Sequence, residues 1–157
     1  MSTIKREDFT GSLLQLLKES FEGPPPDIGS AYLDKGAGLF QTLEKLSADS
    51  ASAVPSPGAP TVAAHCEHVR FYVAALYEYM QGARGRIDWQ QSWLVQAVSD
   101  AEWEELKAGL RREYETITEY LRSAESLGEE EVGGCMAILA HTAYHLGAIR
   151  QIARALA

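Results

Sequence analysis

Two histidines, His141 and His145, stand four residues apart near the C-terminus. On a helix, this spacing places both imidazoles on one face, one turn apart, where they can bind the same metal ion. The chain has four histidines, and the other two, His65 and His68, lie in a second helical segment. Imidazole is the commonest metal ligand near neutral pH. The sequence therefore predicts a helical bundle that holds a metal ion on three of its four histidines.

The donor set limits the chemistry of this metal. Three neutral imidazoles suit zinc, nickel, iron or copper better than magnesium or calcium. Three protein ligands leave a coordination position open for water or substrate, which is typical of catalytic sites. Thr142 follows His141 where zinc proteases have a glutamate, and the Glu-x-x-His repeats of di-iron bundles are absent. Cys66 points away from the histidine face by periodicity, so we do not expect it to be a ligand.

Helical periodicity directs the histidines inward. At about 100° per residue, Ile138, His141, His145 and Ile149 fall within an arc of about 80°, in the centre of a core-facing stripe. His65 lies near the middle of the apolar side of its helix, and the other histidine of that helix lies at the flank of that side. A single inward histidine is usually a hydrogen-bonded core residue, so a plain bundle without metal is the competing interpretation.

Four long helices are needed to position these side chains. Their predicted ranges are 5–22, 61–82, 99–123 and 129 to nearly the C-terminus, and each has one apolar face. Gly23 and three prolines end the first helix, Thr61 caps the second, and Ser99 with Glu102 forms a capping box for the third. Four such helices predict an all-α four-helix bundle with a long crossover between the first two helices.

The connections are less regular than the helices. Within the crossover, residues 39–46 are expected to be helical and residues 47–60 to form a loop rich in Ser, Ala, Pro and Gly. Residues 83–98 are expected to form a loop or a broken helix. The buried stripe of the third helix is predicted to be Trp103, Leu106, Leu110, Tyr114, Ile117 and Leu121.

Composition excludes some classes of function. The 157 residues have 46% apolar content and a formal net charge of −8, which favours one globular domain, residues 1–157, and argues against nucleic-acid binding. No apolar run approaches the roughly 20 residues that span a bilayer, and the charged N-terminus does not look like a secretory signal. The two cysteines, distant in sequence, fit a reducing compartment. We therefore expect a cytoplasmic protein that binds neither membranes nor nucleic acid.

The chain resembles the DinB-like (YfiT-like) superfamily of metal-binding four-helix bundles. The resemblance rests on the capped helix with a histidine seven residues after its cap, from Thr61 to His68. It also rests on the last-helix pattern His-x3-His-x-Gly-x-Ile, which begins at His141, and on the order of the helices. It extends over essentially the whole chain, and the last-helix pattern is its most specific part.

The resemblance implies that His68, His141 and His145 are the metal ligands, whereas periodicity alone slightly favours His65 over His68. His65 would then be a histidine of the outer shell or an alternative ligand. Gly147 is expected to permit close helix approach. Family members commonly form homodimers and bind metals that include zinc and nickel, so we expect one of these metals. Their activities include thiol transfer, maleylpyruvate isomerisation and metal-dependent hydrolysis of small molecules.

Several other side chains are candidates for the pocket. Trp89 and Trp93 either roof the site or are ordinary core aromatics, and the second interpretation is favoured. Tyr72 and Tyr144 neighbour histidine positions and either donate to a metal-bound ligand or serve packing. Arg150 lies close to the apolar edge of the histidine helix, where it would bind a substrate carboxylate or, in the favoured interpretation, form a surface ion pair.

Two functions are compatible with these residues. The first is a divalent-metal-dependent enzyme, a hydrolase or a thiol S-transferase that acts on a small molecule. The alternative is a non-catalytic metal-binding or stress-response protein that meets a partner through its bundle surface.

Overall fold

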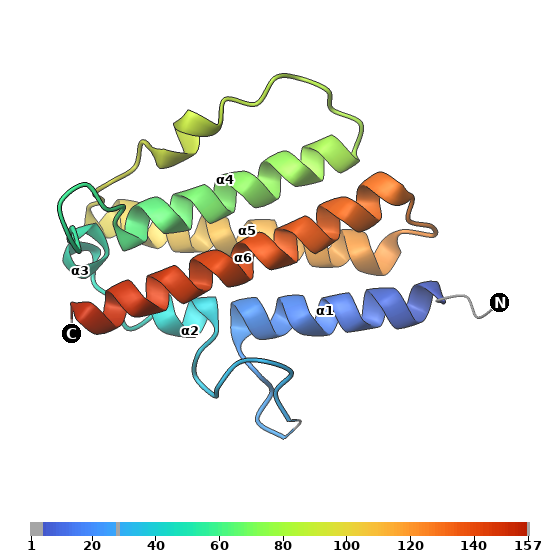
Figure 1. The fold of residues 1–157 in the computed structure, drawn as a ribbon, viewed down its shortest axis with the longest axis horizontal. Helices are drawn as coiled ribbons and strands as arrows, with labels where there is room; N and C mark the ends of the chain where they lie inside the picture. The colour runs from blue at the N-terminus through green and yellow to red at the C-terminus, as the bar shows by residue number, and fades with distance from the viewer. Residues whose placement is uncertain (1–4, 28, 157) are drawn as a thin grey trace.

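The computed structural model describes residues 5–27 and 29–156, and within these residues it is helical with no strand. Its long helices are α1 (Arg6–Glu22), α4 (Val62–Met80), α5 (Asp100–Ser123) and α6 (Glu129–Ala155), and its short ones are α2 (Leu39–Leu43), α3 (Ala48–Ser52) and the 3-10 helix η1 (Trp89–Trp93). The four long helices run alongside one another, and α2 and α3 lie in the connection between α1 and α4 (Figure 1). The predicted all-α bundle with a long crossover is confirmed.

The ends of the long helices lie at the glycine and capping residues predicted from the sequence. Gly23 ends α1 with a φ of 94°, a conformation that glycine adopts without strain. The Thr61 side chain accepts a hydrogen bond from the backbone N–H of Ala64 and so caps α4. Ser99 and Glu102 form the predicted capping box at the start of α5. These local interactions fix where the histidine-bearing α4 begins and how the connection after η1 enters α5.

The crossover departs from the sequence prediction at two points. Residues 47–60 are not entirely a loop, because α3 forms within them, capped by Ser47, whose side chain accepts from the backbone N–H of Ser50. Ala48 and Ala51 of α3 are buried against the bundle, so tertiary packing stabilises this single turn. In addition, α2 ends at Leu43, three residues before the predicted end.

The core lies between the four long helices. The predicted stripe of α5 is buried in full: Trp103, Leu106, Leu110, Tyr114, Ile117 and Leu121. The expectation for Gly147 is wrong, since this glycine is exposed and a Cβ there would meet nothing within 4 Å. The close approach occurs at Gly134, where a Cβ would lie 2.6 Å from Sδ of Met80. Gly134 therefore lets α6 pack closely against α4, two turns before the histidines of α6.

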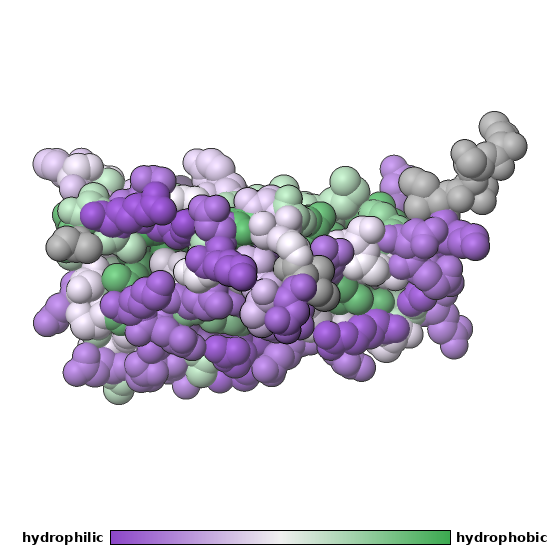
Figure 2. Space-filling model, turned by 90° about the horizontal axis from the view of Figure 1, so that it is seen from below, coloured by the Kyte–Doolittle hydropathy of each residue, from purple (hydrophilic) through white to green (hydrophobic). Residues whose placement is uncertain are grey.

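The outer surface of the bundle is largely polar. Seen from below, the face formed by α1 and the crossover is mainly hydrophilic, with small apolar areas between charged side chains (Figure 2). By length and composition alone, α6 would suffice to cross a membrane, with a mean hydropathy of 1.3 over an 18-residue window. A core helix of a helical bundle has the same composition, so this property is weak evidence for a membrane span.

A buried carboxylate holds the start of the crossover against α1. Glu19 of α1 is 1% exposed, and its carboxylate accepts hydrogen bonds from the backbone N–H groups of Ala31, Tyr32 and Leu33 at 2.8, 2.7 and 2.6 Å. Burial alone would raise the pKa of Glu19, but the three backbone donors outweigh it and the pKa is lowered. The charged form of Glu19 therefore stabilises the folded protein.

Replacing Glu19 by glutamine should lower the free energy of unfolding by about 1–3 kcal/mol, because the neutral amide cannot accept all three hydrogen bonds. The measurement is urea unfolding at pH 7, with the exposed Glu7→Gln as the matched control. The pKa of Glu19 is lowered in the folded state, so its carboxylate stabilises the protein fully above the ordinary carboxyl pKa of 4.5. The difference in unfolding free energy between wild type and Glu19→Gln should therefore shrink as the pH falls below 4.5 and through the lowered pKa of the folded state. Equal stability of Glu19→Gln and wild type at pH 7 would contradict this role.

Candidate metal centre

Packing of α4 against α6 brings three histidines together. One ring nitrogen each from His68, His141 and His145 lies within 4.8 Å of the others, and this is the only such group of His, Cys, Asp or Glu among the residues that the structure describes. The Nε2 atoms of His68 and His141 are 3.1 Å apart. Two nitrogens bound to one tetrahedral zinc ion at about 2.05 Å are separated by about 3.3 Å, so this spacing fits a shared ion.

Ser92 of η1 fixes the orientation and the tautomer of His68. Its hydroxyl lies 2.7 Å from the carbonyl oxygen of Trp89, to which it donates, and 2.6 Å from Nδ1 of His68. Since the hydroxyl proton is used on the carbonyl, Nδ1–H of His68 donates to the serine oxygen. The Nε2 atom of neutral His68 therefore carries a lone pair directed into the cluster, as a metal ligand requires.

His65 contacts the cluster from the outside. Its Nδ1 lies 2.9 Å from Nδ1 of His145, so one of these nitrogens donates and the other accepts. If His145 donates, its Nε2 atom is left with a free lone pair. The structure groups His68 rather than His65 with the two histidines of α6.

Aromatic rings cover the histidines. Trp93 stacks on His68 with ring centroids 4.0 Å apart, and Tyr72 stacks on His141 at 3.6 Å and 8°. Trp89 packs against Tyr72 at 5.5 Å and is 39% exposed. Neither tryptophan is a fully buried core residue, and Trp93 lies directly over the site. The Nδ1 atom of His141 is buried and has no hydrogen-bond partner among the described residues, so on this side the ring is held by its stacking on Tyr72 alone.

Two other predicted pocket residues lie further out. Tyr144 is 73% exposed, and its ring meets that of His145 edge-on at 5.0 Å, so it lies at the rim of the cluster. Arg150 lines a separate cavity that contains no histidine. The expected ion pair of Arg150 is not found, because no carboxylate among the described residues lies within 4 Å of its guanidinium.

Ser92 was not predicted from the sequence. It is the one fully buried residue of η1, between Trp89 and Trp93, which are both candidates from the sequence. A serine in a loop carries no periodic signal, and its partner is 24 residues away in sequence. Only the path of the connection after α4, which arches back over that helix (Figure 1), reveals the contact.

The electrostatics keep the histidines neutral. Burial, followed by the neighbouring histidines, lowers the pKa of His145 to about 3 and that of His141 to about 4. Burial also lowers the pKa values of His65 and His68. Neutral imidazole is the form that binds a metal ion, so the donor set is ready for a cation at pH 7.

The cysteines do not take part in this site. Cys66 and Cys135 are both buried and free, and burial raises the pKa of both thiols, that of Cys135 to about 11. Neither belongs to the histidine cluster. The arrangement, three convergent neutral imidazoles with an oriented outer shell, thus fits a divalent transition metal.

The fold and the site define a helical bundle with a histidine-based metal centre. The sequence profile of the DinB superfamily matches residues 34–149, a span that includes all four histidines and most of the bundle. The chain therefore belongs to the DinB superfamily. No curated protein and no solved structure matches it.

Replacing Ser92 by alanine should weaken zinc binding by roughly 10–100-fold, because His68 loses the hydrogen bond that fixes its tautomer. The affinity is measured on metal-stripped protein by competition with a chromogenic chelator. Ser123→Ala, at an exposed position of α5, is the matched control and should bind zinc like the wild type. An unchanged affinity of Ser92→Ala would show that the contact does not orient the ligand.

The metal-free protein should lose stability as the pH falls from 7.5 to 5. The pKa values of His141 and His145 are lowered in the folded state, so the unfolded chain takes up protons first below about pH 6.5, the ordinary histidine value. Urea unfolding at several pH values measures this slope, in a range where most carboxylates stay ionised. A His145→Gln variant should show a shallower slope, and an identical slope would refute the assignment.

Proposed function

We propose that His68, His141 and His145 bind one divalent transition metal, zinc or nickel, and that the protein is a metal-dependent hydrolase or thiol S-transferase that acts on a small molecule. The observation that carries the proposal is the convergence of three neutral imidazole nitrogens within 4.8 Å. Membership of the DinB superfamily supports it. Three protein ligands leave a position for a water molecule or a substrate atom.

A divalent ion held there supplies Lewis acidity, which lowers the pKa of a water or thiol that it binds. The chain itself provides the orientation and the enclosure. Ser92 and His65 hold the rings of His68 and His145 through their Nδ1 atoms, and Trp93 shields the cluster from water. Because both cysteines of the chain are buried away from the site, the thiol in a transfer reaction comes from the substrate.

The exposed Tyr144 at the rim gives the site a side from which a substrate can approach. The proposal also includes the cytoplasmic location and the homodimer that are expected from the sequence.

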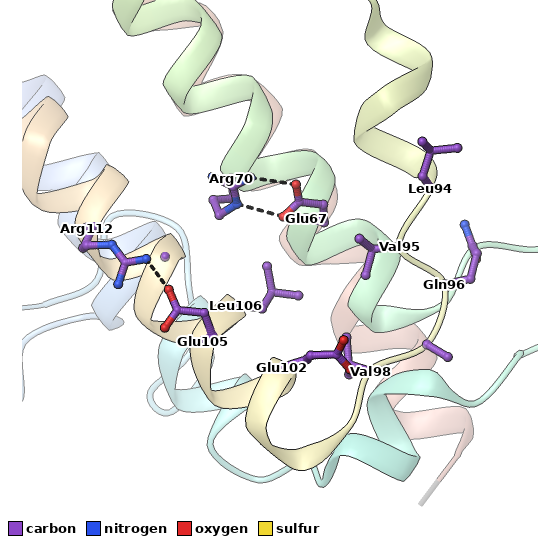
Figure 3. Close-up of a pocket in the computed structure, with 12 residues that line it drawn as sticks. Glu67, Arg70, Leu94, Val95, Gln96, Val98, Glu102, Glu105, Leu106 and Arg112 are labelled. Atoms are coloured by element: carbon purple, nitrogen blue, oxygen red, sulfur yellow. Dashed lines mark hydrogen bonds and ion pairs between the residues drawn. The ribbon is translucent and has the colours of Figure 1, made fainter.

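The second candidate is a non-catalytic metal-binding or stress-response protein. The close stacking of Trp93 and Tyr72 on two of the three histidines favours it, because these rings leave little room beside the ion. In addition, the cavity of about 690 Å³ drawn in Figure 3 lies on the α5 side of α4, away from the histidines. In this case the metal would stabilise the bundle without turnover of a substrate.

Elemental analysis of untagged protein should find close to one zinc or nickel ion per chain. His68→Ala and His141→Ala should each lose the metal, because two imidazoles bind a divalent ion far more weakly than three. His65→Ala should retain it, since His65 contacts the cluster only through His145. Absence of metal from the wild type even after incubation with zinc or nickel would overturn the proposal.

Turnover separates the two candidates. Metal-loaded and stripped protein are compared by thermal shift, beside assays of ester hydrolysis and of transfer of a small thiol to an electrophile. Metal-dependent turnover that is lost in His141→Ala supports the enzyme. A metal-dependent rise in melting temperature with no turnover of either substrate class supports the non-catalytic protein.

A further inference from the structure

A second concave site is lined by residues from the C-terminal end of α6 and from the end of α2. These two ends lie side by side in the ribbon of Figure 1. Its volume is about 450 Å³, and its walls come from the last turns of α6, from the turn at residues 34–36 and from the end of α2. Four cationic side chains line it: Lys35, Lys45, Arg150 and Arg154. They come from three separate stretches of the chain, so the fold rather than a local sequence run gathers them.

These four cations form no ion pairs with described residues, although the chain is rich in acidic side chains. The chain has 22 acidic residues against 14 lysines and arginines. Yet within residues 5–27 and 29–156, none of the four cations has a carboxylate oxygen within 4 Å. Lys35 reaches the carbonyl oxygen of Pro26 at 3.3 Å. Asp34 is the single acid in the lining, and it too forms no ion pair among the described residues.

The cavity in Figure 3 shows the opposite arrangement. There Arg70 donates two hydrogen bonds to Glu67, at 2.8 and 2.7 Å, and Arg112 contacts Glu105 at 2.6 Å. The positive charges of that cavity are therefore compensated within the protein. In the cavity beside α2 they are not, although both cavities belong to the same acidic chain.

The four positive charges, which have no acidic partner among the described residues, repel one another. Arg150 and Arg154 are four residues apart on α6, so their side chains share one face, and like charges at this spacing destabilise a helix. The negative end of the helix dipole offsets part of this repulsion. It does not account for Lys35 and Lys45, which belong to the crossover and converge on the same cavity.

We propose that this cavity binds a small organic anion with two or more phosphate or carboxylate groups. Guanidinium groups bind both kinds of oxyanion through paired hydrogen bonds, and the lysines add mobile point charges. Leu46 and Ala153 provide apolar contact for the carbon skeleton of the ligand. Lys35 sits beside Gly36, whose φ of 75° forms the tight turn that brings the lysine to the rim.

Binding at this site is independent of the proposed metal. None of the histidines lines the cavity, and none of its lining residues belongs to the histidine cluster. The anion would bind equally to metal-loaded protein and to His141→Ala. A protein that binds no metal but still binds the anion would contradict the metal centre alone, and a metal-binding protein that binds no anion would contradict the anion site alone.

Isothermal titration of the full chain at low salt tests the proposal with two probes, fructose 1,6-bisphosphate for phosphates and tricarballylate for carboxylates. At least one probe should bind with a stoichiometry near one. Arg150→Gln and Lys45→Gln should each weaken it about tenfold or more, as expected for charge-assisted hydrogen bonds. Raising the salt to about 0.5 M should weaken binding too, because screening shortens the range of these charges.

Arg122→Gln is the matched control, since it removes the same charge from an exposed arginine of α5 outside the cavity. It should bind the probe like the wild type. A preference for one probe identifies the anionic group of the ligand. The proposal would be overturned if neither probe bound at millimolar concentration. It would also be overturned if Arg122→Gln weakened the binding of the probe as much as Arg150→Gln does. Circular dichroism confirms that each variant is folded, and Lys45→Gln tests the site from an exposed position outside α6.

Discussion

The contact between α4 and α6 is the constraint on which the site depends. It places four imidazoles at one helix interface, and a buried polar ring is tolerated only where its nitrogens have partners. His68 bonds to Ser92, and His65 bonds to His145, so two of these partnerships use atoms that face away from the cluster. The Nε2 atom of His68 is thereby left as an acceptor, which faces Nε2 of His141 at 3.1 Å and is suited to bind an ion.

The connection between α4 and α5 depends on one of these histidines, His68. This segment has no core of its own, because apart from Ser92 the residues of η1 are at most partly buried. It is held over α4 by the hydrogen bond of Ser92 and by the stacking of Trp93 on His68. The dependence is reciprocal: the histidine positions the connection, and the connection fixes the tautomer of the histidine. A ligand at the histidines would therefore act on this segment directly.

Much of the bundle could be predicted from the sequence because its signals are local. The Ser99–Glu102 capping box and the stripe of α5 concern residues three or four positions apart. Periodicity also directs the histidines toward the core, but the choice of His68 over His65 rests on the family resemblance and not on periodicity. The position of Ser92, the packing role of Gly134 and the turn at α3 depend on which distant surfaces meet. Gly134 approaches Met80, 54 positions earlier, and no spacing within one helix indicates such a contact.

Arg150 shows how one helix can serve two sites. The sequence makes it a candidate for the histidine pocket, because helical periodicity places it close to the apolar edge of the histidine helix. Five residues on a helix correspond to a rotation of about 140°, so the arginine and His145 project toward different neighbours. His145 faces α4, whereas Arg150 faces the end of α2 and joins cations from the crossover. Since α6 is a single rigid element from Glu129 to Ala155, it fixes the spacing between the two sites while keeping their charges apart. The neutral imidazoles near the middle of α6 thus remain suited to a cation, although the C-terminal end of the same helix gathers positive charge.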